Sequence, residues 1–230
     1  MENAIIMASG LGTRMRPLTL TTPKPLIKVR ETPMIETLIT TLRKRGAENI
    51  YVVVGYLADQ FDYLKKKYGV TIIYNEDYET ANNISSLYYA RDVLTQGDCF
   101  ICEADLYIAD TDLLNLPLSY SGYFGEMKAG YSDDWVFELD DSGYISRVGK
   151  GGIDCYNMVG ISFFKQKNGK LLSELIGSAY YDLNNRSLFW DDIVNRNLNN
   201  LKLQIYPIRH QQIIEIDTVE ELNAINHAVR

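Results

Sequence analysis

Glycines and cations gather in the first 25 residues of the chain, directly after a short apolar run. Gly10 and Gly12 follow the apolar residues 3–8, and Arg14 and Lys24 come next. Glycines let backbone N–H groups approach an anion closely, while Arg binds phosphate with two donors and Lys supplies a mobile point charge. The segment therefore predicts a phosphate-binding loop, with an ordinary turn carrying surface cations as the alternative.

The spacing of this loop excludes two common nucleotide motifs. It does not match GxGxxG, because nothing small stands three residues after Gly12, and it does not match GxxxxGK[ST]. A dinucleotide site would also place an acid at the end of the second strand, where residues 54–56 read Val-Gly-Tyr. A phosphate cradle of another type remains.

Aspartates at two positions offer carboxylates for a divalent cation. Asp105 follows an apolar strand at 100–102, at the edge where α/β sheets bind ligands, and a turn or helix cap is its alternative role. Asp191 follows Leu-Phe-Trp near a helix start, where a plain N-cap competes, and Asp192 stands beside it. Carboxylates suit hard divalent cations.

The elements that must position these residues alternate between strand and helix through the first 105 or so residues. Strands are expected at 3–8, 50–54, 70–74 and 100–102, and helices at 33–45, 61–68 and 84–94, the first with Thr32 as its N-cap and Pro33 as its first residue. Such alternation is typical of βαβ crossovers and a mainly parallel sheet flanked by helices.

The second half of the chain changes character. A hairpin is expected from two strands, 135–139 and 144–148, around an Asp-Asp-Ser-Gly turn. Further expected elements are a strand at 158–164, helices at 171–176 and 191–198, short strands at 203–207 and 213–216, and a final helix from a capping box at 218–221. We therefore expect one α/β domain over 1–230, with a nucleotide-binding half at 1–110, an acceptor-binding half at 111–230 and antiparallel additions late in the chain.

Composition limits the partners and the compartment. The net charge of −7 argues against nucleic acid, and no apolar run approaches the roughly 20 residues that a membrane span needs. The N-terminus does not read as a signal peptide. The three cysteines, Cys99, Cys102 and Cys155, are sparse, and the CxxC pair falls inside a strand-like run without a second pair. We expect a cytoplasmic protein with no nucleic-acid or membrane partner.

Several stretches carry a resemblance to a known family. Residues 10–19, Gly-Leu-Gly-Thr-Arg-Met-Arg-Pro-Leu-Thr, followed by Pro-Lys-Pro-Leu at 23–26, resemble the signature of nucleotidyltransferases with a Rossmann-like fold, which include the sugar-1-phosphate nucleotidylyltransferases. The likeness extends to the bacterial phosphocholine cytidylyltransferase branch. The segments that carry this second likeness span the chain in order: 54–56, 75–87, 103–105, 190–192 and 214–217.

The resemblance implies transfer of a nucleoside monophosphate from a nucleoside triphosphate, with attack at the α-phosphorus and release of pyrophosphate. Such transfer requires positioning and charge neutralisation, and therefore Mg²⁺ on one or two carboxylates. The family pattern favours Asp105 and Asp191 as metal ligands. It also implies that Lys24 contacts the α-phosphate, and that Arg14 holds the β- and γ-phosphates with the loop amides.

The resemblance also implies a set of nucleotide-binding residues. Asn83 and Ser86 would face the pyrimidine, although Asn82 and Asn83 are also ordinary N-caps. Residue types alone do not separate CTP from UTP. The whole set is Ala8, Ser9, Gly10, Leu11, Gly12, Thr13, Arg14, Lys24, Gly55, Tyr78, Asn83, Ser86 and Ala104.

The acceptor side is expected in the second half of the chain. A quaternary ammonium is bound by aromatic faces, at about 0.5–2 kcal/mol per cation–π contact, together with nearby carboxylates. The candidates are Trp135, Phe189 and Trp190 with Glu215 and Asp217, and core packing is the alternative for each aromatic. Lys150, in a segment at 149–152 that we expect to be flexible, is a candidate for the acceptor's phosphate or phosphonate.

The leading hypothesis is therefore a Mg²⁺-dependent transfer of CMP from CTP to phosphocholine. Lys150, and Phe189 at a position where Tyr was expected, leave room for a primary amine such as 2-aminoethylphosphonate, which prefers carboxylates to a cage. A sugar-1-phosphate acceptor is a further alternative. A nucleotide-binding module without catalysis is disfavoured, because Lys24, Asp105 and Asp191 occur together. The oligomeric state is left open.

Overall fold

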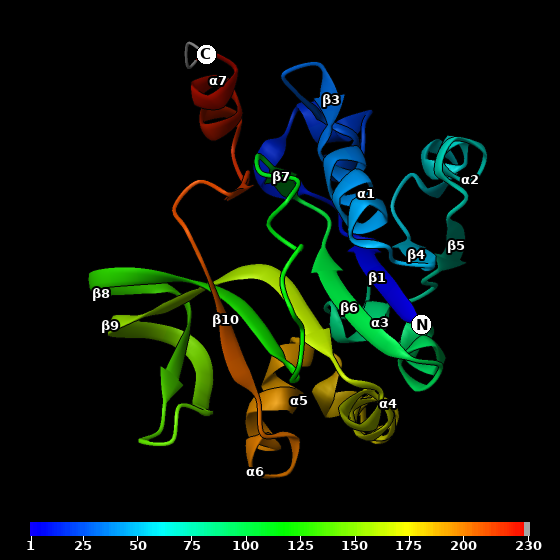
Figure 1. Ribbon diagram of the computed structural model, residues 1–230. Coiled ribbons are helices and arrows are strands. Elements are labelled where there is room, and N and C mark those ends of the chain that lie inside the picture. The colour runs from blue at the N-terminus through cyan, green and yellow to red at the C-terminus, as the bar shows by residue number, and fades with distance from the viewer. Residues whose placement is uncertain (228–230) are drawn as a thin grey trace.

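An apolar strand, β1 (Glu2–Ala8), lies at the centre of the fold because both of its faces are covered (Figure 1). The computed structural model describes residues 1–227, so the last three residues of the predicted domain lie outside it. Ala4, Ile6 and Ala8 pack into one hydrophobic cluster, while Ile5 and Met7 pack into another. The alternation of strand side chains thus places a core on each face of one sheet.

The central sheet has seven strands in the order β10-β8-β9-β6-β1-β4-β5. The four strands of the first half are parallel, whereas β9 is antiparallel to both β6 and β8. The predicted parallel sheet with antiparallel additions is confirmed. Besides β1, the strands of this sheet are β4 (Asn49–Val54), β5 (Thr71–Tyr74), β6 (Asp98–Glu103), β8 (Gly122–Leu139), β9 (Ile145–Phe164) and β10 (Gln204–Ile208).

Helices cover the two faces of the sheet in separate groups. Helices α1 (Met34–Arg45) and α2 (Tyr63–Tyr68) contribute to the first cluster, and α3 (Ile84–Ala90), α4 (Gln166–Tyr181), α5 (Trp190–Arg196) and α6 (Leu198–Leu201) to the second. The predicted helix at 84–94 is divided, since its last part is the 3₁₀ helix η5 (Arg91–Thr95). No helix within residues 1–227 is long and apolar enough to cross a bilayer.

The remaining 3₁₀ helices are short. They are η1 (Thr13–Met15), η2 (Leu18–Leu20), η3 (Lys24–Leu26), η4 (Ala58–Phe61) and η6 (Leu183–Asn185). The strands β2 (Lys28–Val29) and β3 (Thr32–Pro33) form a small separate sheet before α1.

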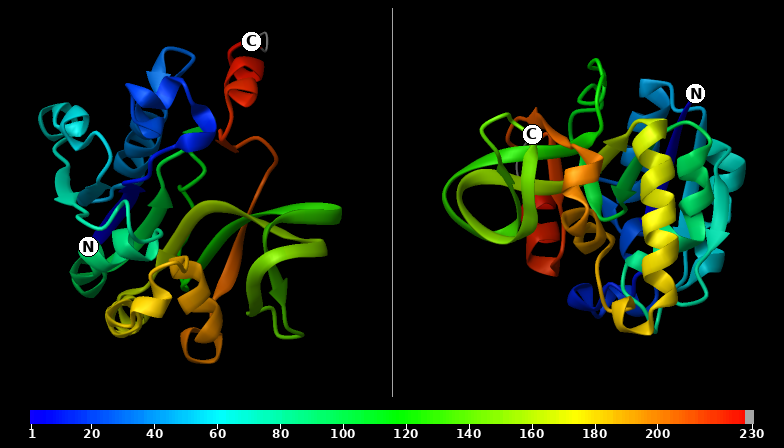
Figure 2. Two further views of the ribbon diagram at one scale, coloured as in Figure 1. Left: turned by 180° about the vertical axis from the view of Figure 1, so that it is seen from behind. Right: turned by 90° about the horizontal axis from the view of Figure 1, so that it is seen from below.

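The hairpin is much longer than the strands predicted at 135–139 and 144–148, and its two strands curve strongly (Figure 2). Val136 in β8 faces both Gly149 and Asn157 in β9, because register shifts bend the two strands back on themselves. The turn at 140–143 forms as expected. The prediction of a flexible segment at 149–152 is wrong, because these residues are part of β9 and are paired with β8.

A second small sheet brings the end of the chain back to the first half. Figure 1 shows the chain after β10 returning toward β7 (Leu106–Ile108), which pairs antiparallel with β11 (Ile213–Glu215). The backbone N–H of Ile216 donates to the carbonyl of Asp105 at 3.2 Å. Residues directly after β11 therefore lie beside the end of β6. The final helix, α7 (Val219–His227), starts at the expected capping box.

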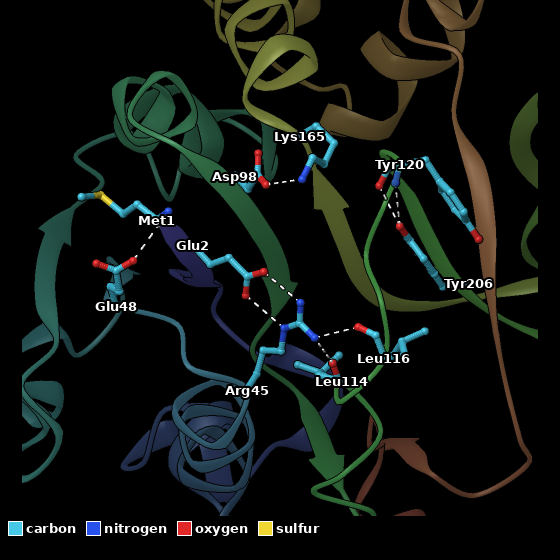
Figure 3. A network of polar contacts seen from close by, with 10 residues as sticks. All are labelled: Met1, Glu2, Arg45, Glu48, Asp98, Leu114, Leu116, Tyr120, Lys165 and Tyr206. Atoms are coloured by element: carbon cyan, nitrogen blue, oxygen red, sulfur yellow. Dashed lines mark hydrogen bonds and ion pairs between the residues drawn. The ribbon is translucent and has the colours of Figure 1, made fainter.

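Polar contacts close the opposite end of the sheet, at the amino ends of β1 and β6 (Figure 3). Arg45 pairs with Glu2 at 2.9 Å and donates to the carbonyls of Leu114 and Leu116. Asp98 accepts a hydrogen bond from the N–H of Gln166 at 2.8 Å and pairs with Lys165. These contacts fix α1 and α4 to the sheet and leave its carboxyl end free for a site.

Candidate active site

The glycine loop leaves β1 at its carboxyl end and folds against Lys24. Gly12 has φ +60, and a Cβ at that position would lie 2.9 Å from Cβ of Lys24 and 3.0 Å from Cγ2 of Thr19. The hydroxyl of Thr19 donates to the carbonyl of Gly12 at 2.8 Å. Only glycine therefore permits both this backbone conformation and the close approach of the loop to Lys24.

A cavity of about 360 Å³ opens along this loop at the carboxyl ends of the strands. Most of the predicted nucleotide residues line it: Ala8, Ser9, Gly10, Gly12, Thr13, Arg14, Lys24, Tyr78, Asn83, Ser86 and Ala104. Leu11 is not among its lining residues. Gly55 lies behind the wall, where a Cβ would come within 2.5 Å of Cγ of Tyr78, so glycine lets this tyrosine pack against the strand end.

Two cations and two acids meet at one end of this cavity. Nζ of Lys24 lies 2.6 Å from Oδ2 of Asp105 and 2.5 Å from Oδ1 of Asp217, and Nη1 of Arg14 lies 2.6 Å from Oδ2 of Asp217. Burial alone would lower the pKa of Lys24, but the two carboxylates outweigh burial and raise that pKa above its usual value. Lys24 is therefore held as a cation facing the cavity.

The acids that converge on one point are Asp105, Glu215 and Asp217, whose carboxylate oxygens all lie within 4.8 Å of one another. Three carboxylates of this kind fit a hard cation that prefers oxygen ligands. Reduced hydration and the charges of Asp105 and Asp217 raise the pKa of Glu215 to about 8, as expected for crowded acids. Glu215 and Asp217, which the sequence reading placed with the acceptor, lie beside Asp105.

Asp191 lies outside this group of acids. It is buried at the start of α5, where its carboxylate accepts a hydrogen bond from the hydroxyl of Tyr123 at 2.9 Å. Burial raises the pKa of Asp191 to about 7. Within the residues that the structure describes, Asp191 is not among the ligand atoms that converge with those of Asp105.

Glu103, which was not predicted as a site residue, lies between the acids around Asp105 and the buried Asp191. It lines the main cavity and also a smaller one of about 10 Å³, together with Tyr123, Trp190 and Asp191. Burial, followed by the negative charges of Asp105 and Asp191, raises the pKa of Glu103 well above its usual range. The sequence feature that could have identified Glu103 is its position at the carboxyl end of the predicted strand, two residues before Asp105.

The wall expected to face the pyrimidine is a chain of hydrogen-bonded polar groups. The amide of Asn75, also missed, donates to the hydroxyls of Ser85 at 2.9 Å and Ser86 at 3.3 Å. Asn83 accepts from the backbone N–H of Trp190 at 3.0 Å and donates to Glu103 at 3.2 Å. The N-cap alternative for Asn83 fails, because its side chain makes no capping hydrogen bond to α3.

The aromatic residues predicted for the acceptor do not form one cage. Trp135 meets Phe189 edge to face, with ring centroids 5.3 Å apart. Trp190 is only 3% exposed and stacks on Tyr123 inside the second core cluster. Lys150 is exposed on β9 opposite Trp135 and does not line the main cavity. Of the aromatic residues Trp135, Phe189 and Trp190, only Phe189 lines the main cavity.

Comparison with known proteins agrees with this geometry. Residues 3–117 match the model of the nucleotidyl transferase family. The chain is 54% identical to a 2-aminoethylphosphonate cytidylyltransferase of Lancefieldella rimae, over 98% of this chain and 92% of the relative. It is 32% identical to a choline-phosphate cytidylyltransferase of Streptococcus pneumoniae, over 99% of this chain and 98% of that one.

Solved structures give the same result. The structure of CTP:phosphocholine cytidylyltransferase from Streptococcus pneumoniae has a TM-score of 0.90 at 32% identity and covers 100% of this chain and 99% of its own. An inositol-1-phosphate CTP transferase from T. maritima shares the fold with a TM-score of 0.77 at 16% identity, covering 100% of this chain and 98% of its own. The chain therefore belongs to the nucleotidyl transferase family and is an enzyme of its cytidylyltransferase branch.

Proposed function

We propose that the protein transfers CMP from CTP to 2-aminoethylphosphonate and releases pyrophosphate. The observation that carries this acceptor is that two further acids, Glu103 and Glu215, lie close enough to Asp105 for its negative charge to raise their pKa values. A primary ammonium donates hydrogen bonds, and carboxylates accept them strongly. A bound ammonium would also pull down the raised pKa values of these acids.

The placement of the aromatic residues also favours an acceptor with a primary ammonium over one with a quaternary ammonium. A methylated ammonium cannot donate strong hydrogen bonds and depends on exposed aromatic faces. Trp190 is buried in the core, so Trp135 and Phe189 are the two predicted cage residues that remain. The higher identity to the aminoethylphosphonate enzyme, 54% against 32%, favours the same acceptor.

In the proposed reaction, cationic side chains of the cavity stabilise the charge of the phosphates. An oxygen of the acceptor's phosphonate attacks the α-phosphorus of CTP, the bond to the bridging oxygen breaks, and pyrophosphate leaves with the electron pair. Lys24 would stabilise charge on the α-phosphate, while Arg14 and the loop amides would hold the β- and γ-phosphates. Both cations line the cavity, in reach of a nucleotide bound there.

We also propose that Mg²⁺ is held by Asp105 and Asp217, with Glu215 beside them. Their converging oxygens fit this hard cation, whereas the predicted partner Asp191 is engaged by Tyr123. The ion would neutralise phosphate charge and orient the phosphates. Lys24 and Arg14 would exchange their carboxylate partners for phosphate oxygens when the nucleotide binds.

The cytoplasm is the proposed compartment, as three buried cysteines without disulfides suggest. The choice of CTP rests on the relatives, because the polar wall of Asn75, Asn83 and Ser86 suits either pyrimidine.

Pyrophosphate release tests the proposal. The purified protein with Mg²⁺ is given CTP or UTP, with 2-aminoethylphosphonate, phosphocholine or a sugar 1-phosphate in turn. We expect CTP with 2-aminoethylphosphonate to give at least about tenfold higher kcat/KM than any other pair. Phosphocholine is the second candidate, because Trp135 and Phe189 still meet edge to face; a preference for it would refute the first choice.

A further inference from the structure

Two irregular surface segments lie against each other beside the main cavity. Residues 75–83 join β5 to α3 and contribute Tyr78 and Asn83 to the cavity, while residues 182–189 join α4 to α5 and contribute Phe189. Few side chains of either segment are buried. Their relative position therefore depends on polar contacts more than on apolar packing.

Asp77 is the hub of these contacts. Its Oδ2 accepts hydrogen bonds from the hydroxyl of Tyr89, at 3.1 Å, and from the hydroxyl of Tyr180, and its Oδ1 lies 3.6 Å from Nη1 of Arg186. Tyr180 also stacks on Tyr88 with ring centroids 4.1 Å apart. One carboxylate thus joins the base-facing segment to α3, to α4 and to the segment before α5.

Backbone contacts continue the same junction toward the cavity. Asn82 donates its backbone N–H to the carbonyl of Arg186 at 2.7 Å and its side-chain amide to the carbonyl of Ser187 at 3.1 Å. Asn83 then accepts from the N–H of Trp190, the first residue of α5. Asp77, Asn82 and Asn83 are thus joined by direct hydrogen bonds or an ion pair to the segment before α5 and to the first residue of that helix.

We propose that Asp77 is a positioning residue that couples the nucleotide side of the cavity to its acceptor side. A nucleotide that orders residues 75–83 would, through Asp77 and Asn83, also fix Phe189 and the start of α5, where the acceptor is expected. Coupling of this kind makes each substrate bind more tightly in the presence of the other. This inference rests on the proposed two-substrate reaction, and it requires no contact between Asp77 and either substrate.

Calorimetry measures the coupling directly. The dissociation constant of 2-aminoethylphosphonate is determined with Mg²⁺, first alone and then with saturating α,β-methylene-CTP, which cannot transfer its nucleotide. We expect the analogue to tighten acceptor binding at least about tenfold in the wild type and less than about threefold in Asp77→Asn. Asparagine carries no charge, so the ion pair with Arg186 is lost. It also keeps only one accepting oxygen, so that oxygen cannot serve both Arg186 and the hydroxyls of Tyr89 and Tyr180.

Asp98→Asn is the matched control. Asp98 fastens the opposite end of α4 through an ion pair with Lys165 (Figure 3) and a hydrogen bond from the N–H of Gln166. None of these three residues lines the cavity. We expect this variant to lose stability and keep the coupling. Tyr180→Phe, which removes one hydroxyl, serves as the second test and replaces Asp77→Asn if that variant does not fold.

Three results overturn the inference: no coupling in the wild type, full coupling in both Asp77→Asn and Tyr180→Phe, or an equal loss in Asp98→Asn. A wrong acceptor shows itself separately, as absence of turnover with 2-aminoethylphosphonate. The coupling is then measured with phosphocholine, so that the two proposals fail independently.

Discussion

Lys24 and Asp217 are 193 residues apart in the chain, yet Nζ of Lys24 lies 2.5 Å from Oδ1 of Asp217. The same ammonium lies 2.6 Å from Oδ2 of Asp105, so one buried cation joins the glycine loop, the end of β6 and the end of the chain. The three groups are held together before any substrate arrives, so nucleotide binding requires only that Lys24 exchange its carboxylate partners for phosphate oxygens. This relationship is the basis of the predictions that follow.

Lys24→Met should abolish most of the transfer activity. The thioether keeps the length of the side chain but removes the charge, so kcat should fall about 10²–10³-fold. Initial rates of pyrophosphate release measure the effect, and circular dichroism checks the fold. Lys28→Met is the control, since Lys28 is exposed on β2. Activity of Lys24→Met within threefold of wild type would contradict the role assigned to Lys24.

Asp217→Asn and Asp191→Asn should separate metal binding from structure. Asp217 shares the converging oxygens of Asp105 and Glu215, so its loss should weaken Mg²⁺ binding and lower activity at least about 10²-fold. Asp191 is engaged by Tyr123, so its variant should keep the wild-type Mg²⁺ titration curve. Binding of Mn²⁺ as a spectroscopic probe gives a readout independent of turnover. The opposite ranking of the two variants would restore Asp191 as a metal ligand.

Asp191 should also make stability depend on pH. Its pKa is about 7 in the folded protein against an ordinary value of 3.8, so between these values the folded state holds a proton that the unfolded state has lost. The free energy of unfolding should therefore fall as pH rises from about 4 to 7. Asp191→Asn should flatten this dependence and, at pH 8, raise the free energy of unfolding by on the order of 2 kcal/mol.

Urea unfolding at pH 5 and pH 8 measures this effect, with Asp192→Asn as the control. The carboxylate of Asp192 accepts a hydrogen bond from the N–H of Phe189 at 2.9 Å and closes the start of α5. Its replacement should cost about 1 kcal/mol instead of stabilising the protein at pH 8. If Asp191→Asn is no more stable than wild type at pH 8, the buried carboxylate carries no such penalty.

Gly12→Ala should damage nucleotide binding far more than Gly10→Ala. A Cβ at Gly12 meets Lys24 and Thr19 within 3.0 Å at a φ of +60, whereas a Cβ at Gly10 meets nothing within 4 Å. The first variant should raise the KM for CTP at least about tenfold and cost about 1 kcal/mol of stability. The second should stay within about threefold of wild type. Steady-state kinetics with varied CTP decide, and equal effects would show that packing against Lys24 is unimportant.

Much of the first half was predictable from local patterns. The strand predicted at 3–8 is central and buried because residues 4–8 are uniformly apolar, which is typical of a strand covered on both faces. The turn at 140–143 and the capping box at 218–221 also formed as predicted, since each depends on residues within four positions of one another. By contrast, the rolled shape of the β8–β9 hairpin depends on register shifts between strands, for which local sequence carries no signal.

The sequence by itself determined the family, the phosphate loop and the residue types that carry the charge. These follow from spacing within short segments, since Gly10, Gly12 and Arg14 lie within five residues and Lys24 follows ten positions later. The tertiary structure alone decided which acids meet. Pairing of β11 with β7 brings Asp217 to Asp105, whereas burial behind Tyr123 removes Asp191 from them. Contacts between distant residues depend on strand pairing and on the free energy of burying each charge, and spacing along the chain encodes neither.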